Sequence, residues 1–206
     1  LLAATTAAQP IAERVGPGML RYFADAEARD GRLPSLALPT PRPGIGPAPA
    51  DVAVRVEFTR VQGRAAARIA VADGTSLYGT GEVPGPLLRN GRRNVCWNTD
   101  AYAYGLHSPS LYQSHPWVLA VRPDGTAFGV LADTSYRCLI DLKAGILFVA
   151  DGPDFPIIVI DRDSPQAVLR GLAELTGTIE LPPLWALGYH QCRYSYVPDE
   201  RVLEIA

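Results

Sequence analysis

The sequence has little of what membrane proteins, nucleic-acid-binding proteins and disulfide-stabilised domains need. No apolar run approaches the roughly 20 residues that a membrane-spanning helix requires. The 206 residues carry 19 basic and 21 acidic side chains and no basic cluster, so neither nucleic acid nor an anionic membrane is an expected partner. The three cysteines, Cys96, Cys138 and Cys192, are odd in number and far apart, which argues against a disulfide framework and a CxxC metal site.

Other features that would indicate targeting, metals or cofactors are also missing. Leu1 to Ala4 has no initiator methionine and no basic flank of a signal peptide, so we expect the chain to be cut at this point. Reduced, mostly buried thiols are expected for the cysteines, which fits a cytoplasmic protein. His107, His115 and His190 do not have the spacing of metal ligands, and no phosphate-binding glycine motif is present. We therefore expect no metal and no cofactor.

Residues after position 50 have the period of two that is typical of half-buried strands. Val52 to Phe58 and Arg64 to Ala72 alternate in this way, and Asp124-Gly125 predicts a hairpin turn between two apolar runs. The other predicted strands are Leu77-Tyr78, Trp117 to Val121, Ala127 to Leu131, Cys138 to Leu142, Ile146 to Ala150 and Phe155 to Ile160. Residues 84–116 lack a clear period and predict a long loop, of a length that is commonly functional.

The first 50 residues and the stretch after residue 163 have different patterns. Met19 to Phe23 predicts a short strand, although the alanines that follow leave a helix open. Pro34 to Pro49 contains six prolines and two glycines, which favours an extended connector. Ser164-Pro165 then predicts the start of a helix with apolar residues at helical spacing, and Gly177 predicts its end.

The last stretch, Leu181 to Tyr196, organises the functional interpretation. Its apolar part, Leu184 to Tyr189, predicts a buried strand, with Arg193 and Tyr194 at the carboxyl end and a helix starting after Pro198. Such a unit cannot bury its own faces, because a parallel strand needs neighbours and a helix needs a sheet to lie on. We therefore expect the first βα step of a truncated β/α barrel, in which functional groups collect at the carboxyl ends of strands.

Five blocks in this order resemble the amino-terminal part of glycoside hydrolase family 31, the α-glucosidase and α-xylosidase group. They are Tyr78 to Glu82, Trp97 to Asp100, Tyr112 to Pro116, Phe128 to Leu131 and Leu181 to Tyr196. The resemblance implies a mainly β fold, with an antiparallel galactose mutarotase-like β-sandwich followed by one helix and the first βα unit of the barrel. The expected divisions are a poorly defined leader with a Pro-rich connector (1–50), the β-sandwich (51–163), a connecting helix (164–180) and the barrel start (181–206).

The resemblance also implies a retaining α-glycosidase that acts on α-linked glucosides. Its two catalytic aspartates lie late in the barrel, so no catalytic residue is expected in this chain, and the chain alone is expected to be inactive. Asp100 matches a substrate-binding aspartate, with an Asx-turn as the structural alternative. Tyr194 matches a tyrosine that lines the sugar pocket, and Arg193 either orients a carboxylate of the site or forms a salt bridge. The expected partners are an α-linked oligosaccharide or glucoside and the remainder of the chain's own catalytic domain.

Two other functions fit the same sequence. A stand-alone carbohydrate-binding module would use Trp97, Tyr102 and Tyr104 as stacking surfaces. A mutarotase-like sugar isomerase would share the sandwich, and fold alone does not decide between them. Mutarotase chemistry needs acid and base groups, usually with histidine, and the histidines here form no convincing pair. Neither alternative uses residues 181–206, which favours the glycosidase.

Overall fold

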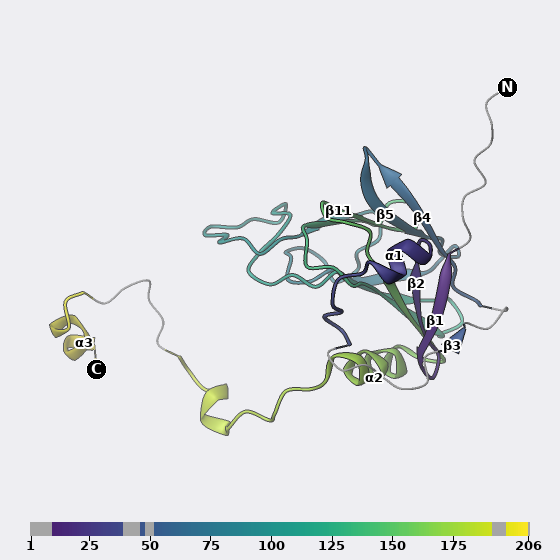
Figure 1. The fold of residues 1–206 in the computed structure, drawn as a ribbon. Coiled ribbons are helices and arrows are strands. Elements are labelled where there is room, and N and C mark those ends of the chain that lie inside the picture. The colour runs from purple at the N-terminus through teal and green to yellow at the C-terminus, as the bar shows by residue number, and fades with distance from the viewer. Residues whose placement is uncertain (1–9, 39–45, 48–51, 191–196, 206) are drawn as a thin grey trace.

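Two antiparallel β-sheets dominate the computed structural model, which describes residues 10–38, 46–47, 52–190 and 197–205 (Figure 1). The larger sheet has seven strands in the order β3-β1-β2-β12-β9-β8-β6, and the smaller has five in the order β4-β5-β11-β10-β7. The predicted mainly β class and the antiparallel sandwich are confirmed.

The strands of the larger sheet come from the beginning, the middle and the end of the sandwich sequence. They are β1 (Ile11–Gly16), β2 (Met19–Phe23), β3 (Gly46–Pro47), β6 (Ser76–Gly79), β8 (Trp117–Val121), β9 (Ala127–Ala132) and β12 (Ile157–Arg162). The strand prediction for Met19 to Phe23 is confirmed, and Met19 lies opposite Ile160 in the β2–β12 pairing. The sandwich therefore includes strands that precede residue 51. A short helix, α1 (Ala26–Asp30), follows β2, with Asp25 as its N-cap.

The smaller sheet contains the predicted pairs, although its first strand begins at Val56 and not at Val52. It also contains one strand that the sequence did not reveal. Its strands are β4 (Val56–Val61), β5 (Arg64–Ile69), β7 (Arg93–Cys96), β10 (Cys138–Asp141) and β11 (Ile146–Ala150). β7 lies inside the stretch that was predicted to be a loop, so that prediction is wrong for these four residues. The alternation of apolar and polar residues that predicts a strand is missing here because Asn94, which is only 4% exposed, is polar where an apolar residue would be expected.

The larger sheet is buried on both faces. Its inner face packs against the smaller sheet, and the core between them includes the fully buried Phe148, Ile140 and Ile157. Its outer face carries a second apolar layer with Met19 and Ile160. Burial on both faces explains why β9 and β12 read as continuous apolar runs rather than as alternating ones.

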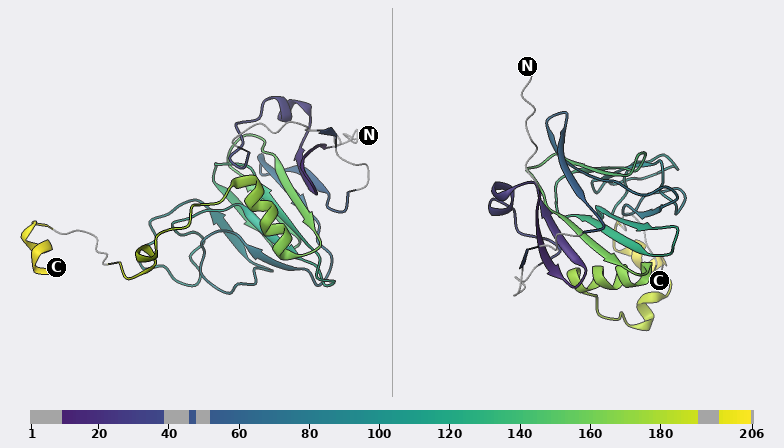
Figure 2. Two further views of the ribbon diagram at one scale, coloured as in Figure 1. Left: turned by 90° about the horizontal axis from the view of Figure 1, so that it is seen from below. Right: turned by 90° about the vertical axis from the view of Figure 1, so that its right-hand side faces the viewer.

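The outer layer is covered by α2 (Pro165–Thr176), which lies across the larger sheet (Figure 2). Ser164 caps the helix by accepting a hydrogen bond from the Ala167 N–H, and Gly177 ends it at φ 81°, as predicted. A Cβ on Gly171 would lie 2.8 Å from Ile160 Cγ2, so the glycine allows the helix to lie close to β12. No helix in the described ranges is both long and apolar enough to cross a membrane.

The buried strand predicted over Leu184 to Tyr189 is not formed. Leu184–Leu187 is instead a short 3₁₀ helix, η1, and Trp185 is 77% exposed. A strand needs neighbours for its backbone N–H and C=O groups, and this segment has left the sandwich beyond α2 (Figure 1). The predicted helix after Pro198 is present as α3 (Glu200–Ile205).

An ion pair at the edge of the smaller sheet predicts a pH effect. Arg93 of β7 lies opposite Asp141 of β10, and its Nε donates to Asp141 Oδ2 at 3.0 Å. Burial raises the pKa of Asp141, but the Arg93 guanidinium and the Lys143 N–H offset this and hold the pKa below its usual range. A carboxylate whose pKa is lower in the folded state stabilises the fold at pH values above its unfolded pKa, which is about 4. This stabilisation is lost as the pH falls through the folded pKa.

We therefore expect Asp141→Asn to lower the free energy of unfolding by about 1 kcal/mol at pH 7. The difference from the wild type should shrink as the pH falls below about 4, because the wild-type carboxylate is then protonated too. Denaturant titrations at pH 7 and at low pH measure this difference. Asp73→Asn, at an exposed turn, is the matched control; equal losses in the two variants would contradict the assignment to the Arg93 pair.

Candidate functional site

The loop of residues 97–116 connects β7 to β8 and extends from one end of the sandwich (Figure 1). Its two stems are joined by backbone hydrogen bonds, from the Val95 N–H to the Pro109 carbonyl at 2.9 Å and from the Thr99 N–H to the Leu111 carbonyl at 2.7 Å. The Ser110 hydroxyl also donates to the Trp97 carbonyl. These bonds fix the base of the loop and leave residues 100–104 to project beyond it.

Asp100 lies on the projecting part of this loop. Its side chain is exposed, and no hydrogen bond or ion pair reaches its carboxylate from the described residues, so the Asx-turn alternative is not what the structure shows. Tyr102 is 93% exposed and Tyr104 58% exposed. The loop thus presents an exposed carboxylate and two exposed aromatic rings within five residues of sequence, a combination that can hold the hydroxyls and the apolar face of a sugar.

The tip of the loop folds back toward the sandwich. The Ser108 N–H donates to the Gly105 carbonyl at 3.0 Å, and the Gly105 N–H donates to Ser108 Oγ at 3.0 Å. Arg92 reaches the Leu106 carbonyl with a long hydrogen bond of 3.4 Å. These bonds close the tip of the loop and connect it to the start of β7.

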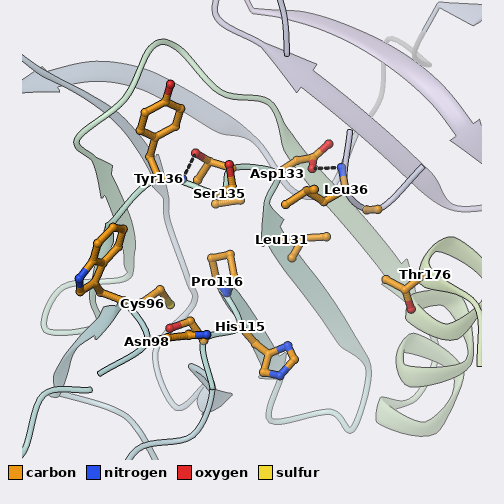
Figure 3. Close-up of a pocket in the computed structure, with 15 residues that line it drawn as sticks. Leu36, Cys96, Asn98, His115, Pro116, Leu131, Asp133, Ser135, Tyr136 and Thr176 are labelled. Carbon is orange, nitrogen blue, oxygen red and sulfur yellow. Dashed lines mark hydrogen bonds between the residues drawn. The ribbon is translucent and has the colours of Figure 1, made fainter. Parts of the chain in front are cut away.

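A cavity of about 490 Å³ lies beside the base of the loop. Figure 3 shows Asn98 and Tyr136 on one side of it and Thr176, at the end of α2, on the other. About half of the residues that line it are apolar or aromatic, namely Leu36, Ala37, Cys96, Trp97, Pro116, Leu131, Ala132 and Tyr136. The others are polar: Asn98, Ser114, His115, Asp133, Thr134, Ser135 and Thr176. Such a wall suits an apolar side chain or a sugar face better than an ion.

Asp133 has a structural role in this wall. Its Oδ1 accepts a hydrogen bond from the Leu36 N–H at 3.0 Å (Figure 3), and its Oδ2 accepts one from the Ser35 hydroxyl. The carboxylate therefore attaches the beginning of the Pro-rich stretch to the end of β9. With both oxygens engaged, Asp133 is not a free acid or base for mutarotase chemistry in the cavity.

The described cysteines are buried free thiols, as predicted. Burial raises the pKa of Cys96, in the cavity wall, to about 12, and burial also raises the pKa of Cys138, its register partner on β10. Neither thiol is ionised at neutral pH, so neither is a nucleophile there. Cys192 lies outside the described residues.

The structure places only part of the predicted site. Arg193 and Tyr194 lie outside the described residues, so their predicted roles stay predictions. The described ranges hold no group of three or more His, Cys, Asp or Glu side chains that could bind a metal. Sequence reasoning missed Asp133, for which the one available signal was a carboxylate directly after an apolar strand.

Comparison with known proteins identifies the family. Residues 36–141, just over half of the chain, match the model of the glycosyl hydrolase 31 N-terminal galactose mutarotase-like domain. This defines the sandwich as a domain of the galactose mutarotase-like class found in glycosyl hydrolases. The chain belongs to glycosyl hydrolase family 31.

Similar proteins are glycosidases of much greater length. Alpha-glucosidase 2 of Bacillus thermoamyloliquefaciens is 42% identical over 136 residues, which are 63% of this chain and 17% of that protein. The alpha-glucosidase of Saccharolobus solfataricus is 35% identical over 135 residues, 63% of this chain and 19% of that protein. The chain therefore spans about a fifth of the length of these relatives.

Solved structures agree with the fold. A family 31 alpha-glucosidase from Bacteroides thetaiotaomicron aligns with 71% of this chain and 25% of its own, at 53% identity and a TM-score of 0.62. A family 31 dextranase from Flavobacterium johnsoniae, complexed with glucose, aligns with 95% of this chain and 29% of its own, at 20% identity and a TM-score of 0.75. The second likeness supports the fold alone.

Proposed function

We propose that this chain is the amino-terminal part of a retaining α-glycosidase that acts on α-linked glucosides. In this proposal it supplies a substrate-binding loop, and the catalytic aspartates belong to a barrel that follows. The observation that carries the proposal is the exposed Asp100 carboxylate, which shares with the exposed Tyr102 and Tyr104 a loop whose base is fixed by backbone hydrogen bonds. The glucosidase names of the relatives support the substrate class.

The proposed partner of the sandwich is the remainder of its own catalytic domain. After α2 the chain presents large apolar side chains to solvent, among them Ile179, Leu181, Leu184 and Trp185, each at least 77% exposed. Exposed apolar surface of this extent marks an interaction site. In the proposal, Leu184 to Tyr189 forms its predicted strand only when neighbouring barrel strands pair with it, and Arg193 and Tyr194 then face the sugar.

The proposed location of the protein is the cytoplasm. The two buried free thiols among the described residues support this proposal, because cysteines stay reduced in that compartment.

The direct test compares this chain with the protein expressed from its full reading frame. We expect the full protein to release 4-nitrophenol from 4-nitrophenyl α-glucoside and the 206-residue chain to release none, because the two carboxylates of the retaining mechanism lie outside it. Circular dichroism should show that the chain is folded in the assay. Hydrolysis by the purified chain, or a full protein with no α-glycosidase activity, would contradict the proposal.

A carbohydrate-binding module is the second candidate, and the exposed aromatic rings of Trp97, Tyr102 and Tyr104 favour it. A module of this kind would bind sugars without the rest of the protein. Calorimetric titration of the 206-residue chain with maltose and isomaltose separates the two functions. Binding that is lost in Tyr102→Ala would support the module, whereas the glycosidase proposal expects measurable affinity only when the barrel is present.

A further inference from the structure

Thr80 has an unusual backbone conformation at the end of β6. Gly79, Thr80 and Gly81 all have positive φ angles, of 96°, 75° and 80°. A β-branched residue rarely adopts this conformation, and such strain persists only where the surroundings hold it in place. The two glycines are required by space, because a Cβ on Gly79 would lie 2.8 Å from the Trp117 carbonyl oxygen and one on Gly81 would lie 2.7 Å from the His115 nitrogen.

The contacts of Thr80 connect the two sheets. Its N–H donates to the Trp117 carbonyl at 2.8 Å, which extends the β6–β8 pairing of the larger sheet by one residue. Its Oγ1 accepts a hydrogen bond from Asn94 Nδ2 at 2.9 Å, and Asn94 belongs to β7 of the smaller sheet. Thr80 is 1% and Asn94 4% exposed. The pair is therefore a buried polar contact between sheets whose other core side chains are mainly apolar.

Asn94 and Trp117, the two partners of Thr80, lie on the two stems of the loop that carries Asp100. The loop leaves β7 after Cys96, two residues beyond Asn94, and enters β8 at Trp117. The neighbouring Glu82 N–H adds a bond to the Gln113 carbonyl at 3.0 Å on the returning stem. One residue thus contacts the outgoing and the returning ends of the loop.

We propose that Thr80 is a positioning residue, which fixes the two stems of the 97–116 loop relative to each other and thereby places Asp100. The significance for sugar binding rests on the proposed function, whereas the effect on the loop does not. Removal of the hydroxyl leaves the buried Asn94 amide without this acceptor, and a buried amide without a partner favours opening of the stem.

Hydrogen exchange on the 206-residue protein tests the loop effect. In Thr80→Val, which keeps the shape but not the hydroxyl, the amides of Val95 and Thr99, which are hydrogen-bonded across the two stems, should exchange about tenfold faster. The substitution removes the buried hydrogen bond from Asn94 and also the one that the hydroxyl donates to the Gly79 carbonyl. The amides of β11 and β12 should keep wild-type rates. Thr80→Ser, which keeps the acceptor, should exchange like the wild type.

Thr75→Val is the matched control, because Thr75 is also buried in the turn before β6 and its Oγ1 has no hydrogen-bond partner. Thr75→Val should leave the exchange of the Val95 and Thr99 amides unchanged. If Thr80→Val does not fold, Asn94→Ala removes the same bond from the other side and carries the same expectation. Wild-type exchange at Val95 and Thr99 in the folded variant, or an equal increase in β11, would overturn the proposal.

A second measurement separates this inference from the proposed function. In the protein expressed from its full reading frame, Thr80→Val should raise KM for 4-nitrophenyl α-glucoside several-fold with little change in kcat, and Thr80→Ser should restore KM. An inactive wild type would refute the proposed function, while the exchange data would still decide the role of Thr80. An active wild type whose KM is unchanged in Thr80→Val would refute the link between Thr80 and substrate.

Discussion

Gly129→Ala should lower the free energy of unfolding by about 3 kcal/mol, the upper part of the range for overpacked cores. A Cβ at Gly129 would lie 1.9 Å from Cη2 of Trp117 and 2.5 Å from its Cζ2. Trp117 lies on the neighbouring strand, where it pairs with Leu131, so its indole covers Gly129 diagonally under α2. The indole is rigid and nearly buried, and the clash is relieved only by displacing the helix or the strand. Denaturant unfolding followed by circular dichroism gives the value.

Gly105→Ala is the control for this substitution. The φ of Gly105 is not positive, and a Cβ added there would have no other atom within 4 Å. Its replacement should therefore change the free energy of unfolding by less than about 0.5 kcal/mol. Trp117→Phe combined with Gly129→Ala should recover part of the loss, because the smaller ring leaves room for the methyl group. A Gly129→Ala protein as stable as the wild type would show that Trp117 does not pack over this position.

Asp100→Ala in the protein expressed from its full reading frame should lower kcat/KM for α-glucosides by about 10- to 100-fold. The expected loss is that of a hydrogen bond between a charged group and a substrate hydroxyl, about 1.5–3 kcal/mol. The melting temperature should not change, because the carboxylate is exposed and holds no described part of the chain together. Steady-state kinetics with 4-nitrophenyl α-glucoside and with maltose measure the effect.

Asp73→Ala provides the matched carboxylate for this experiment. Asp73 is exposed in the turn between β5 and β6, where the adjacent Gly74 lies near Pro123 at the opposite end of β8 from the loop. Its removal should leave kcat/KM unchanged. If Asp100→Ala has the kinetics of Asp73→Ala, the loop does not bind substrate, and the proposed role of Asp100 fails.

Much of the sandwich could be predicted because its strands carry local signals. The Asp124-Gly125 turn fixes the β8–β9 hairpin, and Ser164-Pro165 fixes the start of α2. β7 escaped prediction because one of its two buried side chains is the polar Asn94, whose hydrogen-bond partner Thr80 is fourteen residues away in sequence. The place of β2 in the sheet also depends on its pairing with the distant β12, which no local pattern reveals.

The candidate site was predicted less completely than the fold. Asp100 was found because it lies in a block that resembles the family. Its exposure and the hydrogen bonds that join the two stems of its loop came from the structure. The cavity was not predicted, since its wall combines segments from residue 36 to residue 176. The roles of Arg193 and Tyr194 stay predictions.

The sequence by itself determined the family, because the blocks that carry the resemblance are continuous in sequence. It also determined the antiparallel sandwich and the covering helix, because alternation, turn residues and helix caps act over a few neighbouring residues. Only the tertiary structure decided which strands share a sheet, that Thr80 joins the two stems of the loop, and that Leu184 to Leu187 is an exposed 3₁₀ turn. Strand pairing and buried polar contacts depend on partners distant in the chain, and an apolar segment without neighbours for its backbone cannot become a strand, whatever its side chains favour.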